Sequence, residues 1–255
     1  MTSLIKKITL TLVAGLAALA VRAQEDVPLI NFGPAKQLLT LNAHVGAGNS
    51  LISSNLESAF PSITESSLNA GWAFLFGATA EVGLRDYLAL GTEVNLLIDN
   101  YTGDIIVHRE ASRQVSNIFL RNHFYAINFP VYLSLKMNLA STVRWNVDAG
   151  LYYTYGLGGK QHQTVYNAVV NDLGQQILSS YSTTSNYYND SRSFINSAHK
   201  GDIGLHIASG LTFRDRYILG ARARLGLKNI ANTVGLIHPN IHNFSFMVVI
   251  GYRFF

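Results

Sequence analysis

Large apolar residues recur at every second position over the last stretch of the chain. This apolar set is Phe244, Phe246, Val248, Ile250, Tyr252 and Phe254. The positions between them are mixed in character and include Ser245, Gly251 and Arg253. Because successive side chains of a β-strand point to opposite faces, this pattern predicts a strand with one apolar face.

The same alternation appears in seven further segments. They cover 39–45, 74–84, 88–98, 125–137, 145–157, 203–213 and 217–227. Most of the eight segments reach the roughly 9–11 residues that a tilted transmembrane strand needs. A uniformly apolar face is suited to lipid, and the opposite face, with its Gly, Asn and charged residues, is suited to an interior.

Short and long connections alternate along the chain. The short ones lie at 85–87, 138–142 and 214–216, and the long ones at 49–70, 100–122, 158–200 and 229–242. Outer-membrane barrels have short periplasmic turns at one end and long external loops at the other. In a soluble sandwich nothing requires short and long loops to lie at opposite ends. An open sheet edge is too costly in lipid. We therefore predict an all-β protein, an eight-stranded antiparallel transmembrane β-barrel with both termini on the periplasmic side.

The first 23 residues have the layout of a cleavable signal peptide. Lys6 and Lys7 precede an apolar run, and Val21-Arg22-Ala23 forms a cleavage pattern. A membrane-anchoring helix is the weaker alternative, because the run is shorter than the 18 or more residues that favour a spanning helix. The expected organisation is a signal peptide (1–23), a periplasmic lead-in (24–36) and the barrel domain (37–255).

Composition narrows the function classes. Charged residues make up 13% of the chain, about half of the roughly 25% usual in soluble domains, which argues against an ordinary cytosolic enzyme. The absence of Cys excludes disulfides and thiol catalysts. Without Lys6, Lys7 and Arg22 the charges nearly balance, so there is no electrostatic basis for binding nucleic acid.

Ionisable residues on the inward face predict a filled lumen. At eight strands the side chains fill the barrel interior. The inward set is Glu81, Glu93, Lys136, Arg144, Asp148, Asp202, Arg222, Arg224 and Arg253. Four acids and five bases favour a structural network of ion pairs, with a proton or ion path as the alternative.

Five segments carry a family resemblance. They are Tyr125–Lys136, Gly150–Gly156, Asp202–Gly204, Gly226–Ile230 and Gly251–Phe254. In this order they resemble the PorT-like outer-membrane β-barrel family, over most of the mature chain. Pro130 and Lys136 match the family pattern, while Asn128 stands where Glu is usual. The resemblance implies a barrel in the outer membrane of a Gram-negative bacterium, and an accessory role in protein secretion is one expectation.

The C-terminal strand also resembles the signal that the barrel-assembly machinery reads. The residues concerned are Phe246, Val248, Ile250, Tyr252 and Phe254. Phe255 adds one residue beyond the alternating set. The resemblance thus implies two partners, the assembly machinery and outer-membrane lipid.

Enzymatic motifs are missing from the sequence. His238 and His242 lie four apart but flank Pro239, and two His alone do not complete a metal site. His206 and Ser209 fall on opposite faces of one strand, which excludes them as a catalytic pair. We therefore expect no catalytic, cofactor-binding or metal-binding residues.

The connection 158–200 is the best candidate for a contact surface. It combines four Tyr with many Ser, Asn, Thr and Gln, a composition suited to adaptable polar contacts. The expected role is non-enzymatic: structural, or interaction with an envelope protein through the external loops. A narrow channel for small solutes is the alternative, followed by a lipid hydrolase at the barrel rim.

Overall fold

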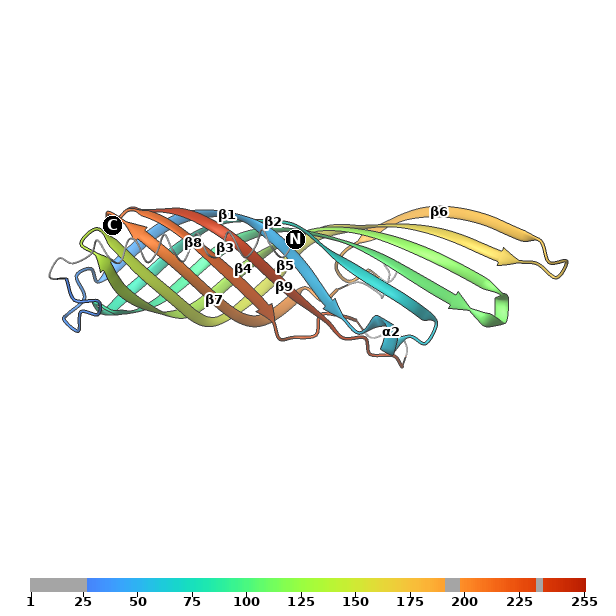
Figure 1. Ribbon diagram of the computed structural model, residues 1–255, viewed down its shortest axis with the longest axis horizontal. Helices are drawn as coiled ribbons and strands as arrows, with labels where there is room; N and C mark the ends of the chain where they lie inside the picture. Colours follow the sequence, from blue (N-terminus) through green and yellow to red (C-terminus); the bar gives the residue numbers. More distant parts are fainter. Residues whose placement is uncertain (1–26, 191–197, 233–235) are drawn as a thin grey trace, which may run out of the picture.

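The computed structural model describes residues 27–190, 198–232 and 236–255, which form a long β-barrel (Figure 1). The signal peptide predicted at 1–23 lies outside the described residues. The strands are β1 (Leu39–Ser54), β2 (Ile63–Arg85), β3 (Leu88–Arg109), β4 (Gln114–Ala140), β5 (Val143–Val170), β6 (Gln176–Asn186), β7 (Gly201–Phe213), β8 (Tyr217–Gly226) and β9 (Ile241–Arg253). A short helix, α2 (Leu56–Ala59), follows β1. In these ranges no helix is long and apolar enough to span a bilayer.

Eight of the strands close into a ring. The ring order is β1-β2-β3-β4-β5-β7-β8-β9, and β9 pairs with β1 to complete it. Every neighbouring pair is antiparallel. The predicted eight-stranded barrel is therefore confirmed. Closure leaves no sheet edge within the ring, as lipid requires.

The loops predicted at 49–70, 100–122 and 158–200 are wrong over much of their length, because the strands continue into them. β4 and β5 have 27 and 28 residues, far more than the roughly 9–11 needed to cross a membrane. The extra strand, β6, lies within 158–200 and pairs with the outer half of β5. Beyond the membrane no face has to be apolar, so the alternation fades while backbone pairing continues.

The alternating faces point as the sequence predicts. Large apolar side chains on the outside are exposed, for example Phe76 on β2, Leu133 on β4 and Val248 on β9. Their inward neighbours are buried, including Glu93, Ser134 and Met247. Apolar side chains thus cover the outside of the ring, and most of the polar ones are enclosed.

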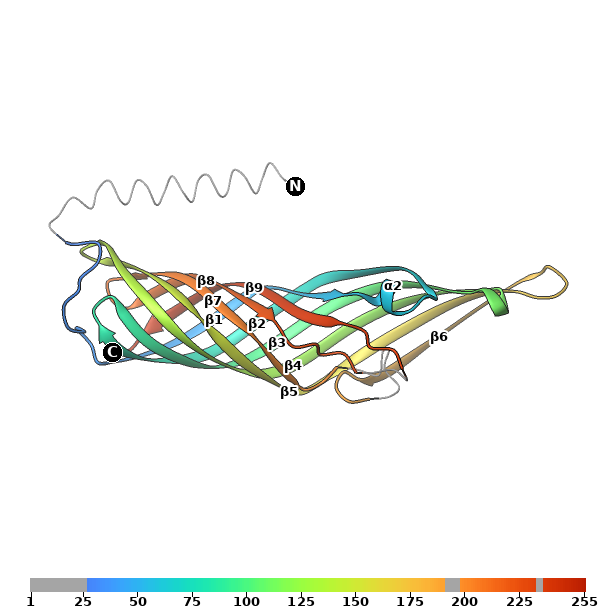
Figure 2. The ribbon, with the colours of Figure 1, turned by 90° about the horizontal axis from the view of Figure 1, so that it is seen from below.

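The three short turns and the C-terminus gather at one end of the barrel, here called the short-turn end (Figure 2). The lead-in and the two residues after it cross this end: backbone amides of Asn138, Asp86 and Gly83 donate to the carbonyls of Leu29, Gly33 and Leu38, respectively, at 2.8–3.2 Å. Gly83 is required for this close approach, because a Cβ there would lie 2.5 Å from the carbonyl oxygen of Gln37.

Beyond the opposite end, β2, β3, β4 and β5 continue past the ring and form an open sheet together with β6 (Figure 1). This projecting sheet comprises residues 63–70, 101–109, 114–123, 160–170 and 176–186. Leu56 of α2 covers part of one face and packs in a cluster with Ile63, Ile105 and Ile118. β6 forms one edge of the sheet, and within the described residues it pairs only with β5.

Candidate functional site: the filled lumen and the projecting sheet

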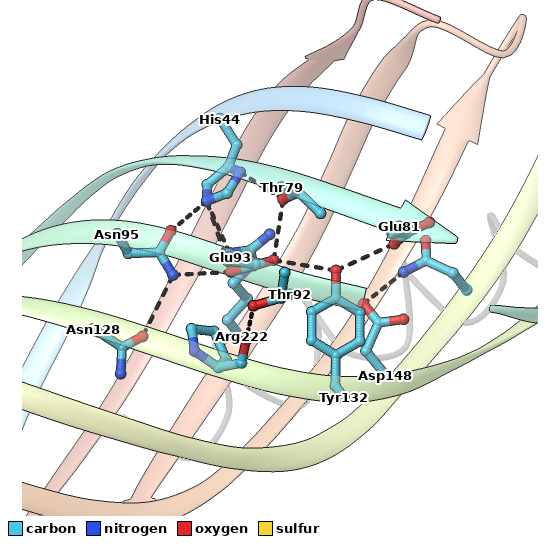
Figure 3. A network of polar contacts seen from close by, with 12 residues as sticks. His44, Thr79, Glu81, Thr92, Glu93, Asn95, Asn128, Tyr132, Asp148 and Arg222 are labelled. Atoms are coloured by element: carbon cyan, nitrogen blue, oxygen red, sulfur yellow. Dashed lines mark hydrogen bonds and ion pairs between the residues drawn. The ribbon is translucent and has the colours of Figure 1, made fainter. Parts of the chain in front are cut away.

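An ion pair between Arg222 and Glu93 occupies the middle of the lumen (Figure 3). The hydroxyl of Thr79 donates to Glu93 Oε1 at 3.2 Å, and the amide of Asn95 donates to Glu93 Oε2 at 2.9 Å. His44 Nε2 lies 2.9 Å from Arg222 Nη1, which joins β1 to the same cluster. The buried carboxylate is therefore both paired and hydrogen-bonded, the condition under which a charge is tolerated inside a protein.

A second ion pair lies next to the first. Lys136 on β4 pairs with Glu81 on β2. The Tyr132 hydroxyl donates to Glu81 at 3.2 Å (Figure 3). The same hydroxyl is 3.5 Å from Glu93 and so connects the two pairs. The cluster thus links strands from several sides of the ring.

Glycines provide the room for these side chains. Gly91 lies opposite Tyr132 in the β3–β4 pairing, and a Cβ on Gly91 would stand 2.5 Å from the tyrosine ring. A Cβ on Gly77 would stand 1.9 Å from Oδ1 of Asn95. Inward glycines therefore allow the larger neighbours to cross the lumen.

Towards the projecting end, another ion pair and an aromatic group fill the barrel. Arg224 pairs with Asp99 at 3.2 Å, and the Tyr152 hydroxyl donates to Asp202 at 3.1 Å. In the same part of the barrel the ring of Tyr187 stacks on the ring of Phe124, with the ring centroids 4.3 Å apart.

The cavities left in the lumen are small. One beside Asn95, His206 and Arg222 has a volume of about 10 Å³, and another beside Asp99 and Tyr187 about 20 Å³. A single water needs roughly 10–15 Å³ by this kind of measure. The lumen of the described structure is therefore packed with side chains.

The nine inward ionisable residues are distributed unevenly among these contacts. Glu81–Lys136 and Glu93–Arg222 pair within the set, whereas Arg144 pairs with Asp86 and Arg224 with Asp99. In the described ranges the remaining three make no ion pair within 4.0 Å, and they accept or donate hydrogen bonds instead. These three are Asp148, Asp202 and Arg253.

Sequence reasoning missed Asp86, Asp99 and His44 as members of the network. Asp99 continues the inward positions of Glu93 and Asn95, so extending that strand by one residue would have found it. The alternation of 39–45 places His44 on the inward face, but it does not indicate that Arg222 is its partner. Asp86 lies in a tight turn, and no pattern marks it.

Among the residues described, no group of three or more His, Asp or Glu is placed to hold a metal ion. His206 is buried and Ser209 is exposed, so the two lie on opposite faces of β7 as predicted.

The projecting sheet differs chemically from the lumen. β6 reads QILSSYSTTSN, with no charged residue and no Pro, and nearly all of its side chains are exposed. On the neighbouring strands Phe119 and Tyr166 form an exposed edge-to-face pair at 5.8 Å. The sheet therefore offers aromatic and hydroxyl groups together with the backbone of an edge strand.

Comparison with known proteins gives a consistent family. Residues 23–232 match the model of the outer membrane protein beta-barrel domain. None of the curated proteins compared with the chain matches it.

Solved outer-membrane proteins are similar at low identity. OprG of Pseudomonas aeruginosa is 12% identical, with 88% of this chain and 99% of that chain covered and a TM-score of 0.42. Ail, the attachment invasion locus protein of Yersinia pestis, is 11% identical, with 84% of this chain and 99% of that chain covered and a TM-score of 0.33. Neisserial surface protein A is 13% identical over 84% of this chain and 97% of its own, with a TM-score of 0.33.

Proposed function

Because this chain belongs to the outer membrane protein β-barrel domain family, we propose that it is a non-enzymatic contact protein of the cell surface. The protein resides in the outer membrane of a Gram-negative bacterium. The barrel anchors it there, and the projecting sheet carries the contact surface. The short-turn end faces the periplasm, as in other outer-membrane barrels.

One observation carries this proposal: four strands of the ring continue beyond it and form, together with β6, a five-stranded sheet whose edge strand β6 is uncharged. Proteins usually protect such an edge with charges, Pro or a covering element. Here the edge is left available, and Tyr and Ser side chains beside it are suited to adaptable contacts. The packed lumen supports the same assignment, since it leaves no path for a solute.

The resemblance to the PorT-like family adds a biological context to the proposal. An envelope protein is the partner that we expect at the projecting sheet, in an accessory role to protein secretion. A narrow channel is the competing function, because channels also occur among outer-membrane barrels. Conductance in planar bilayers distinguishes the two functions.

Excision of the β5–β6 hairpin tests the proposal. Gln161 and Ser185 are directly paired, so residues 162–184 can be replaced by an Asn-Gly turn that preserves the register. We expect a folded barrel that no longer complements a strain lacking the gene. Full complementation by the excised protein would overturn the proposal.

Site-specific photocrosslinking in intact cells provides a second readout. A photoreactive residue at Tyr166 or Tyr181, both exposed on the projecting sheet, should give discrete protein adducts. The matched control is Leu133, which is exposed on the ring and faces lipid. Identical adducts from both places would place the contact on the barrel wall instead.

A further inference from the structure

A cavity apart from the contact surface lies at the short-turn end. It has a volume of about 230 Å³, far above the cavities of the lumen. Its lining includes Ala35 and Lys36 of the lead-in, Arg85 and Asp86 of the β2–β3 turn, and Arg253 of β9. The lead-in therefore forms one wall, and the barrel mouth forms the others.

The charges around this cavity do not balance. Its ionisable lining residues are Lys36, Arg85, Asp86, Lys136, Arg144, Asp215 and Arg253. Lys136 is neutralised by Glu81, and Arg144 by Asp86. Lys36, Arg85 and Arg253 then face Asp215 alone, which leaves a surplus of two positive charges.

Arg253 is the strongest indication of a ligand. Its side chain lines the cavity, yet the residue is only 8% exposed. Nε donates a long hydrogen bond of 3.4 Å to Asn42 Oδ1, and no carboxylate of the described residues lies within 4.0 Å. A buried charge normally has a partner of opposite sign, so the guanidinium is placed to receive an anion.

We propose that this cavity binds a phosphate group, with Arg253 at its base and Lys36 and Arg85 at its rim. Guanidinium groups match phosphate oxygens through paired hydrogen bonds, and a phosphate monoester carries a charge of about −1.5 to −2 that offsets the surplus. Lys36 and Arg85 are exposed, so the ligand enters from the short-turn end. A diffusible phosphate monoester and the phosphodiester of a phospholipid headgroup both present phosphate oxygens to these cations, with the diester carrying a single negative charge. This site is independent of the contact function proposed above.

Calorimetric titration of the mature barrel in detergent micelles tests the site. The probes are inorganic phosphate and monomeric short-chain phosphatidylglycerol, at an ionic strength held constant with chloride. We expect saturable binding of one ligand per barrel. Tighter binding of the lipid identifies a headgroup site, and preference for inorganic phosphate identifies a diffusible ligand. Absence of saturable binding for both probes would overturn the proposal.

Matched double variants establish where the ligand binds. Lys36→Gln with Arg85→Gln should weaken binding at least tenfold, because both cations lie on the cavity rim. Lys160→Gln with Arg121→Gln removes the same charge from exposed positions elsewhere and should leave binding unchanged. Equal weakening by the two double variants would show a non-specific salt effect and overturn the proposal. Arg253→Gln should abolish binding, and the rim variants keep the test valid if that barrel fails to fold.

Discussion

Arg222 and Glu93 form an ion pair across the full width of the barrel. Arg222 lies on β8 and Glu93 on β3, and these strands are opposite one another in the ring. β4, β5 and β7 separate them on one side, and β2, β1 and β9 on the other. One contact thus ties together strands that share no backbone pairing.

Neutralising either partner should destabilise the barrel. Arg222→Gln or Glu93→Gln leaves a buried charge unpaired, which typically costs about 3–5 kcal/mol and less where water enters. Urea unfolding of the two variants in lipid measures this loss. Arg121→Gln, at an exposed position, is the control and should leave the unfolding midpoint unchanged. Unaltered midpoints for both lumen variants would contradict a structural role for the pair.

Adding a methyl group opposite Tyr132 should also be destabilising. The Cβ of Gly91→Ala would meet the tyrosine ring at 2.5 Å, and overpacking of this kind costs about 1–3 kcal/mol. Gly158→Ala is a matched control, because a Cβ there meets no atom within 4 Å. The free energies of unfolding of the two variants should therefore differ. Equal values would mean that Tyr132 moves aside without cost.

The C-terminal aromatic residue should be needed for insertion. Phe254 follows β9, its amide donates to the carbonyl of Leu41, and its side chain is exposed on the lipid side. A chain that ends at Arg253 should lack the heat-modifiable barrel form in the outer membrane. Removal of Phe255 alone is the control and should permit insertion. Normal insertion of the shorter chain would exclude Phe254 from the assembly signal.

Epitope labelling should distinguish the two ends of the protein. A tag in the turn at 171–175, which joins β5 to β6 at the tip of the projecting sheet, should be labelled on intact cells. A tag at Asp215 should react only after the outer membrane is permeabilised. Labelling of the tag at Asp215 on intact cells would show that the short-turn end faces the cell exterior, and it would contradict the proposed topology.

Contact with lipid determines which parts of this structure can be predicted from the sequence. Leu133 must face lipid and Ser134 must not, so the membrane-crossing parts of the strands carry a clear alternation. In β6 most side chains on both faces are exposed, and its run of Ser and Thr has no such period. The sequence consequently predicts loops where the projecting sheet lies.

The sequence predicts which side chains point into the barrel, but not which of these side chains pair with one another. Alternation places Asp148 and Arg222 inside the barrel, but the stagger of the closed sheet decides which inward residues meet. Arg224 therefore pairs with Asp99, which lies beyond the predicted strand, while Asp148 accepts a hydrogen bond from Asn146. A pattern along single strands does not contain this information.

The central claim is that the barrel is filled and that the protein acts through its external sheet. Conductance in planar bilayers tests this claim most directly. We predict that the purified protein inserts, as judged by its heat-modifiable mobility, and leaves the bilayer current at the level of the protein-free control. Arg222→Ala combined with Glu93→Ala should open a measurable current if the barrel persists, because it removes the central obstruction. Stable ion steps from the unaltered protein would contradict the filled lumen and make the channel the leading function.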